Sequence, residues 1–243
     1  DEEDFPGAEK IFLELLEDYE KKGDTSNPNY IAVMGSVARV FMEQNKYDEG
    51  LRYMREGLEL STRINGERHI TTLASMINLG QALSELGKYD EAYIYLDSGY
   101  AASKEMFGEK SPTTIFISVT YASLLLDLGR ISEAETILDE AVRLNIELLG
   151  SEHPNTILSQ YVLSLLLFES DRNSEAEALI RTVLDASTIA LGSDKDMTLE
   201  CRDLMGRILN KKGDHEQAEG IHREVLETRS RVLGSDNPSN ANT

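Results

Sequence analysis

A single period of 42 residues constrains the fold of this 243-residue chain more than any other feature. Glycines recur at this step at Gly66, Gly108, Gly150, Gly192 and Gly234. Small residues recur at Ala8, Gly50, Ala92, Ala134, Ala176 and Ala218. Prolines recur at Pro28, Pro112, Pro154 and Pro238, with Ile70 and Asp196 in the two gaps. Three columns that share one period predict an array of equal units, each of which packs mainly on its neighbours.

Each unit is predicted to contain two helices. A Thr column, at Thr72, Thr114, Thr156 and Thr198, follows the Pro column by two residues, as expected in a first helical turn. Glycines such as Gly87 and Gly129 then end the first helix. Acidic residues open the second helix, where they meet the positive end of its dipole, and a Leu-Gly pair ends it.

Small residues in both helices indicate how the two pack. The first helices carry small residues 12 positions before the small column of the second helices, at Ala38, Gly80, Ala122, Ser164 and Gly206. Two backbones can approach closely where small residues face each other. One pair cannot bury its apolar faces alone, so stacking on neighbouring pairs is expected to complete the core.

The composition excludes several classes of protein. Asp and Glu number 44 against 24 Lys and Arg, a net charge of −20, which disfavours nucleic acid and anionic membrane surfaces as partners. The 40% of hydrophobic residues is enough for a folded chain. The single cysteine, Cys201, rules out an internal disulfide and fits a reducing, cytoplasmic location. The acidic start, Asp1 to Asp4, is unlike a targeting peptide, and without an initiator Met we expect a piece of a longer chain.

The units resemble the tetratricopeptide repeat, in particular the longer repeats of the kinesin light chain type. The matching stretches are Leu149-Gly150-Ser151-Glu152-His153-Pro154-Asn155-Thr156, Asn78-Leu79-Gly80 and Gly87-Lys88-Tyr89-Asp90-Glu91-Ala92. The resemblance implies an all-α, right-handed superhelical solenoid of helix-turn-helix repeats. The chain departs from the pattern where Trp is replaced by Met34, Met76, Ser118, Gln160 and Arg202, and where Asp171 and Asp196 replace Gly and Pro.

The period divides the chain without a long linker. We expect a half repeat at 1–24, whose lone helix spans Ala8 to Lys22, and then five repeats at 25–66, 67–108, 109–150, 151–192 and 193–234. Residues 235–243 are expected to start a further repeat that the sequence does not complete.

The resemblance also implies a binding groove, because in this family the first helices line the concave face. By that resemblance the first repeat contributes Arg39, Met42 and Glu43. The groove residues that the resemblance implies in the later repeats are Asn78, Gln81, Glu85, Phe116, Val119, Ser123, Leu126, Asp127, Leu158, Tyr161, Leu165, Phe168, Asp203, Arg207 and Lys211. This groove has an apolar middle and polar ends, and it carries more acids than bases.

We therefore expect a non-enzymatic scaffold that binds a peptide or helix of a partner protein, with a basic or amphipathic segment favoured over an acidic one. Phe116, Leu126, Tyr161 and Phe168 would anchor that segment. Two alternatives stay open for the apolar middle: its side chains pack the central repeats together, or a flanking segment of the same chain fills it. For the whole array, the alternative function is the sensor or assembly region of a larger signalling protein, such as a nucleotide-dependent switch.

Residues with other chemistry have structural explanations. His215, Glu219 and His222 share a helix at metal-ligand spacing, but a solvated face explains them better. His69 and His153 belong to the turns between repeats, and Cys201 has no His or second Cys nearby in the sequence. We expect no catalytic residues, metal site or cofactor.

Overall fold

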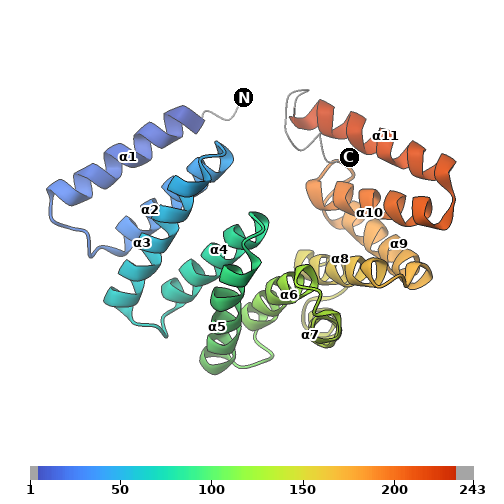
Figure 1. Cartoon of the computed structure of the whole chain (residues 1–243), viewed down its shortest axis with the longest axis horizontal. Coiled ribbons are helices and arrows are strands. Elements are labelled where there is room, and N and C mark those ends of the chain that lie inside the picture. The colour runs from blue at the N-terminus through green and yellow to red at the C-terminus, as the bar shows by residue number, and fades with distance from the viewer. Residues whose placement is uncertain (1–4, 234–243) are drawn as a thin grey trace. The chain divides into compact units, whose positions relative to one another are not determined.

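The computed structural model describes residues 5–233, which form eleven α-helices and no strand (Figure 1). The all-α prediction is confirmed. The helices are α1 Phe5–Lys21, α2 Pro28–Glu43, α3 Tyr47–Asn65, α4 Ile70–Glu85, α5 Tyr89–Phe107, α6 Pro112–Asp127, α7 Ile131–Leu149, α8 Pro154–Glu169, α9 Asn173–Ala190, α10 Asp196–Lys212 and α11 His215–Leu233. The start of a further repeat, predicted at Gly234 to Pro238, lies outside the described residues.

The chain divides into two compact units, Asp1–Glu109 and Lys110–Thr243. In the first unit, α1 packs on α2, and α2 to α5 form two hairpins, α2 with α3 and α4 with α5, that meet through α3 and α4. Aromatic side chains link these helices, since the rings of Tyr19 and Tyr30 meet edge to face at 5.9 Å and those of Phe41 and Tyr53 stack at 5.6 Å. Around Tyr30 and Phe41 the α1, α2 and α3 helices share one apolar core with Leu16, Met34 and Leu60.

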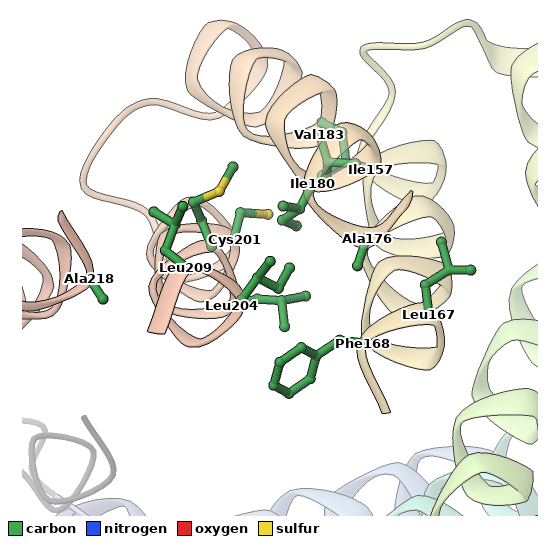
Figure 2. Close-up of a cluster of buried hydrophobic side chains, with 12 residues drawn as sticks. Ile157, Leu167, Phe168, Ala176, Ile180, Val183, Cys201, Leu204, Leu209 and Ala218 are labelled. Carbon is green, nitrogen blue, oxygen red and sulfur yellow. The ribbon is translucent and has the colours of Figure 1, made fainter. Parts of the chain in front are cut away.

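In the second unit, α6 to α11 form three hairpins, and each first helix also contacts the next, α6 with α8 and α8 with α10. A core between α8, α9 and α10 includes Ile157, Ile180, Cys201 and Leu204, all essentially inaccessible to solvent (Figure 2). Because each core is shared by neighbouring hairpins, no hairpin of this unit buries its apolar residues alone.

Local chemistry sets the helix boundaries. Pro begins α2, α6 and α8, where a missing N–H costs no hydrogen bond. The His69 and His153 side chains accept hydrogen bonds from the backbone N–H groups of Thr71 and Asn155, at 3.3 and 3.1 Å, and so cap α4 and α8. The Thr column has a clear role: the hydroxyls of Thr72, Thr156 and Thr198 each donate to the carbonyl of the glycine six residues earlier, at 2.7 to 2.8 Å.

The turn between the two helices of a hairpin needs a left-handed residue. Gly87 and Gly129 take φ of 69° and 71°, and Asn45 and Asp171 take 59° at the equivalent positions. Asn and Asp tolerate this conformation better than other side chains do. The replacement of Gly by Asp171 therefore preserves the turn, and the departure noted in the sequence leaves the fold unchanged.

The small columns lie at close helix contacts, as predicted. Ala38, Ala92, Ala122, Ala134 and Ala176 are fully buried. A Cβ added at Gly50 would lie 3.1 Å from the Ala38 carbonyl oxygen, which shows α2 and α3 in backbone contact. At Gly80 and Gly206 the space is taken instead by a side chain of the second helix, Leu96 or His222. Within 5–233, no helix has the length and hydropathy needed to cross a membrane.

Candidate functional site

An open groove of about 620 Å³ lies between α2 and α4 in the first unit. Its floor and walls come mainly from these two helices, with Met54 of α3 beneath them. The end nearest the helix N-termini is lined by small and apolar residues, among them Ile31, Ala32, Gly35 and Ala74. A chain segment with small or apolar side chains would fit this end, because it lacks bulky protruding groups.

Amides and carboxylates line the rest of the groove. Asn78 is exposed and Gln81 partly exposed on α4, so both side-chain amides are available to donate and accept hydrogen bonds. Glu43 and Glu85 lie in the last turns of α2 and α4. The Glu85 residue is exposed overall, but partial burial of its carboxyl group and, second, the neighbouring Glu43 carboxylate raise its pKa above the ordinary value. The groove therefore becomes negative towards the C-terminal ends of its helices.

The structure brings together the predicted groove residues of the first two repeats. Asn78, Gln81 and Glu85 line this groove together with Arg39, Met42 and Glu43. The N-terminal half of its α2 wall, including Ala32 and Ser36, was not among the residues predicted from the sequence. Steps of three and four residues backwards from Arg39 would have found them.

The predicted groove residues of the second unit differ in exposure. Phe116 is 37% exposed, and Ser123, Leu158, Tyr161 and Leu165 are partly exposed. Val119, Leu126 and Phe168 are instead buried, with 3%, 9% and 8% of their surfaces exposed. The prediction that these three side chains line a partner-binding surface is therefore corrected, because each is already covered by other side chains of this chain. Phe168 belongs to the core between α8 and α10 (Figure 2).

Two predicted groove cations are already paired. The Arg207 guanidinium of α10 bonds the Glu169 carboxylate of α8 at 3.1 Å, and the Lys211 ammonium meets the Asp171 carboxylate at 2.6 Å. Both cations also lie 4.8 Å from the centre of the Phe168 ring. Arg207 and Lys211 therefore close the face of the second unit over Phe168 and join α8 to α10.

A second polar network links α8, α10 and α11. The Glu200 carboxylate accepts hydrogen bonds from the Arg229 guanidinium at 2.6 Å and from the Tyr161 hydroxyl at 3.4 Å. Burial and Glu200 raise the pKa of Tyr161, so its hydroxyl keeps its proton at neutral pH. The predicted groove residue Asp203 bonds His222 of α11 at 3.1 Å, while Asp127 is exposed at the end of α6.

The other chemistry-bearing residues take structural positions. The three side chains at metal-ligand spacing on α11 have separate partners: His215 bonds Asn210, Glu219 pairs with Arg223, and His222 bonds Asp203. Cys201 is buried, and this burial raises the pKa of its thiol to about 12, so it stays protonated and unreactive.

Comparisons with known proteins agree on the fold. The tetratricopeptide repeat family model matches residues 31–105, 113–189 and 166–231. A search of curated protein sequences gives no match. A kinesin light chain-like protein from Podosopora anserina, with nearly identical TPR-like repeats, is 20% identical with a TM-score of 0.66, covering 85% of this chain and 98% of its own. BtubC (BKLC) from P. vanneervenii is 15% identical with a TM-score of 0.73, covering 95% and 93%.

The quorum sensor NprR of B. thuringiensis, solved in complex with its cognate peptide NprX, is 12% identical with a TM-score of 0.67, covering 94% of this chain and 69% of its own. These likenesses confirm the predicted solenoid of tetratricopeptide repeats, and its structural neighbours include kinesin light chain-like repeat proteins. The chain belongs to the tetratricopeptide repeat family, whose members generally act as scaffolds for protein-protein interactions and are typically not enzymes.

Proposed function

We propose that this chain is a protein-binding scaffold that holds a peptide segment of a partner in the groove between α2 and α4. The observation that carries the proposal is the groove itself: about 620 Å³ of open space between the first helices of two successive hairpins, lined by exposed Asn78 and by Gln81. Amide side chains can bond the backbone of an extended or helical segment whatever its sequence. The small residues around Gly35 and Ala74 leave room for that backbone.

The charge of the groove favours a basic or amphipathic segment. Glu43 and Glu85 give its C-terminal end a negative potential, which the helix C-termini reinforce. The same fold in NprR holds a cognate peptide, which supports a peptide as the kind of ligand. The second unit contributes less to this proposal, because Arg207 and Lys211 are paired and three of its predicted groove residues, two of them predicted anchors, are buried.

The test begins with a random peptide library displayed on phage and selected on the whole chain. Selected peptides are synthesised with a fluorophore, and their affinities are measured by fluorescence polarisation. Ala74→Trp fills the groove from an exposed position of α4, and should weaken binding by at least about tenfold, since the ligand would have to displace the indole.

Ala101→Trp is the matched control, because Ala101 is exposed on α5 and does not line the groove. It should leave the affinity unchanged, and circular dichroism should show the same helix content for both variants. Equal binding by Ala74→Trp and the unsubstituted chain would remove the groove as the binding site.

A further inference from the structure

The last turns of the first helices carry equivalent charged residues throughout the array. At the 42-residue step these are Glu43, Glu85, Asp127, Glu169 and Lys211. The set of residues around Glu169 in the second unit thus has an exact counterpart around Glu43 in the first, three repeats earlier. The two sets differ in a way that indicates a ligand.

In the second unit the set is complete within the chain. Glu169 of α8 is paired with Arg207 of α10, whose guanidinium lies over the Phe168 ring, and Lys211 covers the same ring. The acid, the flat apolar platform and the arginine together form a cation site that the chain fills with its own side chain.

In the first unit the same positions lack the cations. Glu43 and Met42 stand where Glu169 and Phe168 stand, but Gln81 replaces Arg207 and Glu85 replaces Lys211. Among the residues that the structure describes, neither Glu43 nor Glu85 has an ion pair, although Arg39 also lines the groove one turn earlier on α2. The acid is kept, the apolar Met42 side chain takes the place of the Phe168 ring, a second acid is added, and the groove opens at this place.

We infer that the groove between α2 and α4 captures an arginine side chain of the bound peptide, with its guanidinium between Glu43 and Glu85 and its stem along Met42. The inference rests on the proposed function and names the residue that the groove recognises. Arginine suits this site because its planar guanidinium can bond two carboxylates at once while its face lies on an apolar side chain. The volume of the groove, about 620 Å³, accommodates both the side chain and the adjoining backbone.

Charge balance within the groove supports the inference. Two carboxylates near each other at the C-terminal ends of two helices are unfavourable, since the helix dipoles are negative there as well. The pKa of Glu85 is raised first by partial burial of its carboxyl group and second by the Glu43 carboxylate, so repulsion between the two acids contributes to the shift. A bound guanidinium would neutralise the repulsion, as Arg207 pairs Glu169 in the second unit.

The test uses the selected peptides and three variants of the whole chain. Replacing a peptide arginine by citrulline, which has nearly the same shape and no charge, should weaken binding by about tenfold or more. Glu43→Gln with Glu85→Gln should remove the difference between the arginine and citrulline peptides. Gln81→Arg gives α4 the residue that α10 carries at the equivalent position, so it should fill the site from within and weaken the arginine peptide to a similar degree.

Glu67→Gln with Glu109→Gln is the charge-matched control, because both residues are exposed in turns outside the groove. It should keep the full preference for arginine. If citrulline peptides bind as tightly as arginine peptides while Ala74→Trp still blocks both, the arginine site is wrong and the proposed groove function stands.

If Ala74→Trp blocks none of the selected peptides, the proposed function fails and the arginine site is decided by a direct probe. The probe is N-acetyl-arginine amide, titrated against chain labelled at its Met methyl groups and followed by NMR. A shift of the Met42 methyl that the citrulline analogue does not cause, and that Gln81→Arg abolishes, supports the site. No shift, or equal shifts with both compounds, overturns it.

Discussion

At the scale of single residues, glycine at position 80 is fixed by packing on Leu96. A Cβ added at Gly80 would lie 2.7 Å from Leu96 Cγ, and Leu96 is fully buried and cannot move aside. Overpacking of this kind costs about 1 to 3 kcal/mol, and the better helix propensity of alanine returns at most about 1 kcal/mol. We expect Gly80→Ala to lower the free energy of unfolding by about 1 to 2 kcal/mol, measured by urea denaturation.

Gly220→Ala supplies the comparison for this prediction. Gly220 also lies inside a helix, α11, but an added Cβ there would meet no atom within 4 Å. The variant should therefore gain about 0.5 to 1 kcal/mol from helix propensity alone. A stabilised Gly80→Ala variant would mean that the α4 and α5 helices can separate at little cost.

Glu85 makes the stability of the first unit depend on pH. Burial and Glu43 raise its pKa in the folded chain, so the folded chain binds more protons than the unfolded chain between the two pKa values. Stability is therefore lost as the pH rises from the unfolded pKa through the folded one. Glu85→Gln removes this loss and should raise the melting temperature at pH 7. Since Glu85 is solvent-accessible, the gain should be below about 1 kcal/mol.

Comparing the melting temperatures at two pH values separates the effect of removing the Glu85 charge from other effects of Glu85→Gln. At pH 3, where the carboxyl is protonated in both states, the variant and the unsubstituted chain should melt at nearly the same temperature. The comparison is made by scanning calorimetry at both values, with Glu67→Gln as an exposed control outside the groove. An equal gain at both pH values would contradict the electrostatic explanation.

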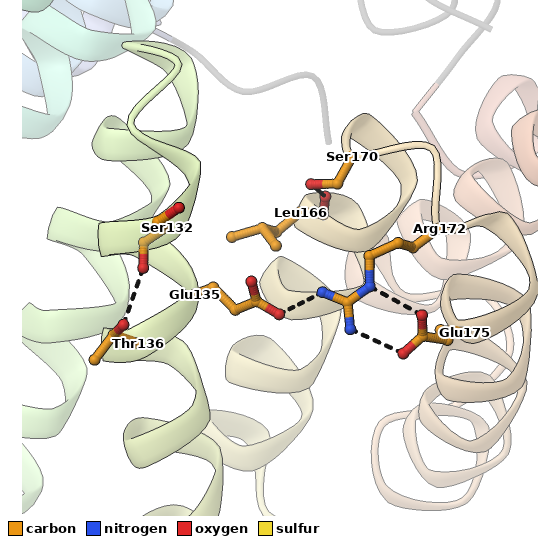
Figure 3. A network of polar contacts seen from close by, with 7 residues as sticks. All are labelled: Ser132, Glu135, Thr136, Leu166, Ser170, Arg172 and Glu175. Carbon is orange, nitrogen blue, oxygen red and sulfur yellow. Dashed lines mark hydrogen bonds and ion pairs between the residues drawn. The ribbon is translucent and has the colours of Figure 1, made fainter.

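At the scale of helices, a cation at the turn between two helices joins neighbouring hairpins. Arg172 precedes α9, donates to both Glu175 carboxylate oxygens at 2.8 and 2.9 Å, and also bonds Glu135 of α7 (Figure 3). Lys46 makes the equivalent bond to Glu9 of α1 at 2.8 Å in the first unit. These pairs connect successive second helices at their N-terminal ends, so they fix the stacking of one hairpin on the next.

We expect Arg172→Ala to destabilise the chain more than the loss of a pair within one helix does, because it removes both the pair with Glu175 and the partly exposed pair with Glu135 of the neighbouring hairpin. Arg181→Ala is the matched change on the same helix, since Arg181 pairs with Glu177 one turn away on α9. It should cost about 0.3 to 0.5 kcal/mol. Urea denaturation at low and high salt measures both, and the two costs should shrink as salt screens the pairs. A larger cost for Arg181→Ala would argue against a stacking role for Arg172.

Helix positions were predictable from the sequence because their signals are local. Pro112 and Gly129 mark the two ends of α6 within a residue or two, and Pro154 marks the start of α8, since caps and left-handed turns depend on the nearest residues only. The binding face was harder to predict. Phe168 has the spacing of a groove residue, but its burial depends on Arg207 and Lys211, which lie 39 and 43 residues away. The residue pattern of α8 alone cannot predict a contact with side chains of another helix.

At the scale of the whole molecule, repeats of the same 42-residue length differ in how closely their first helices approach one another. The first helices of the second unit are in direct contact with one another, whereas a groove separates α2 from α4 in the first unit. The equivalent residues explain the difference. Arg207 forms an ion pair with Glu169 across the two helices, whereas Gln81, at the position equivalent to Arg207, is uncharged and forms no ion pair with Glu43. A change of side chains at fixed register can therefore convert a filled contact into a binding site.

Because each hairpin packs mainly on its neighbours, stability should vary along the chain. Only Leu16 is buried in α1, whereas α6 has ten buried residues, among them Ile115 and Leu125. We expect the amides of α1 to exchange with deuterium at least about tenfold faster than those of α6, because local opening of α1 exposes little apolar surface. Hydrogen exchange read by mass spectrometry measures this. Leu16→Ala should speed exchange in α1 further and leave α8 unchanged, whereas equal acceleration in both helices would show that the array unfolds as one cooperative body.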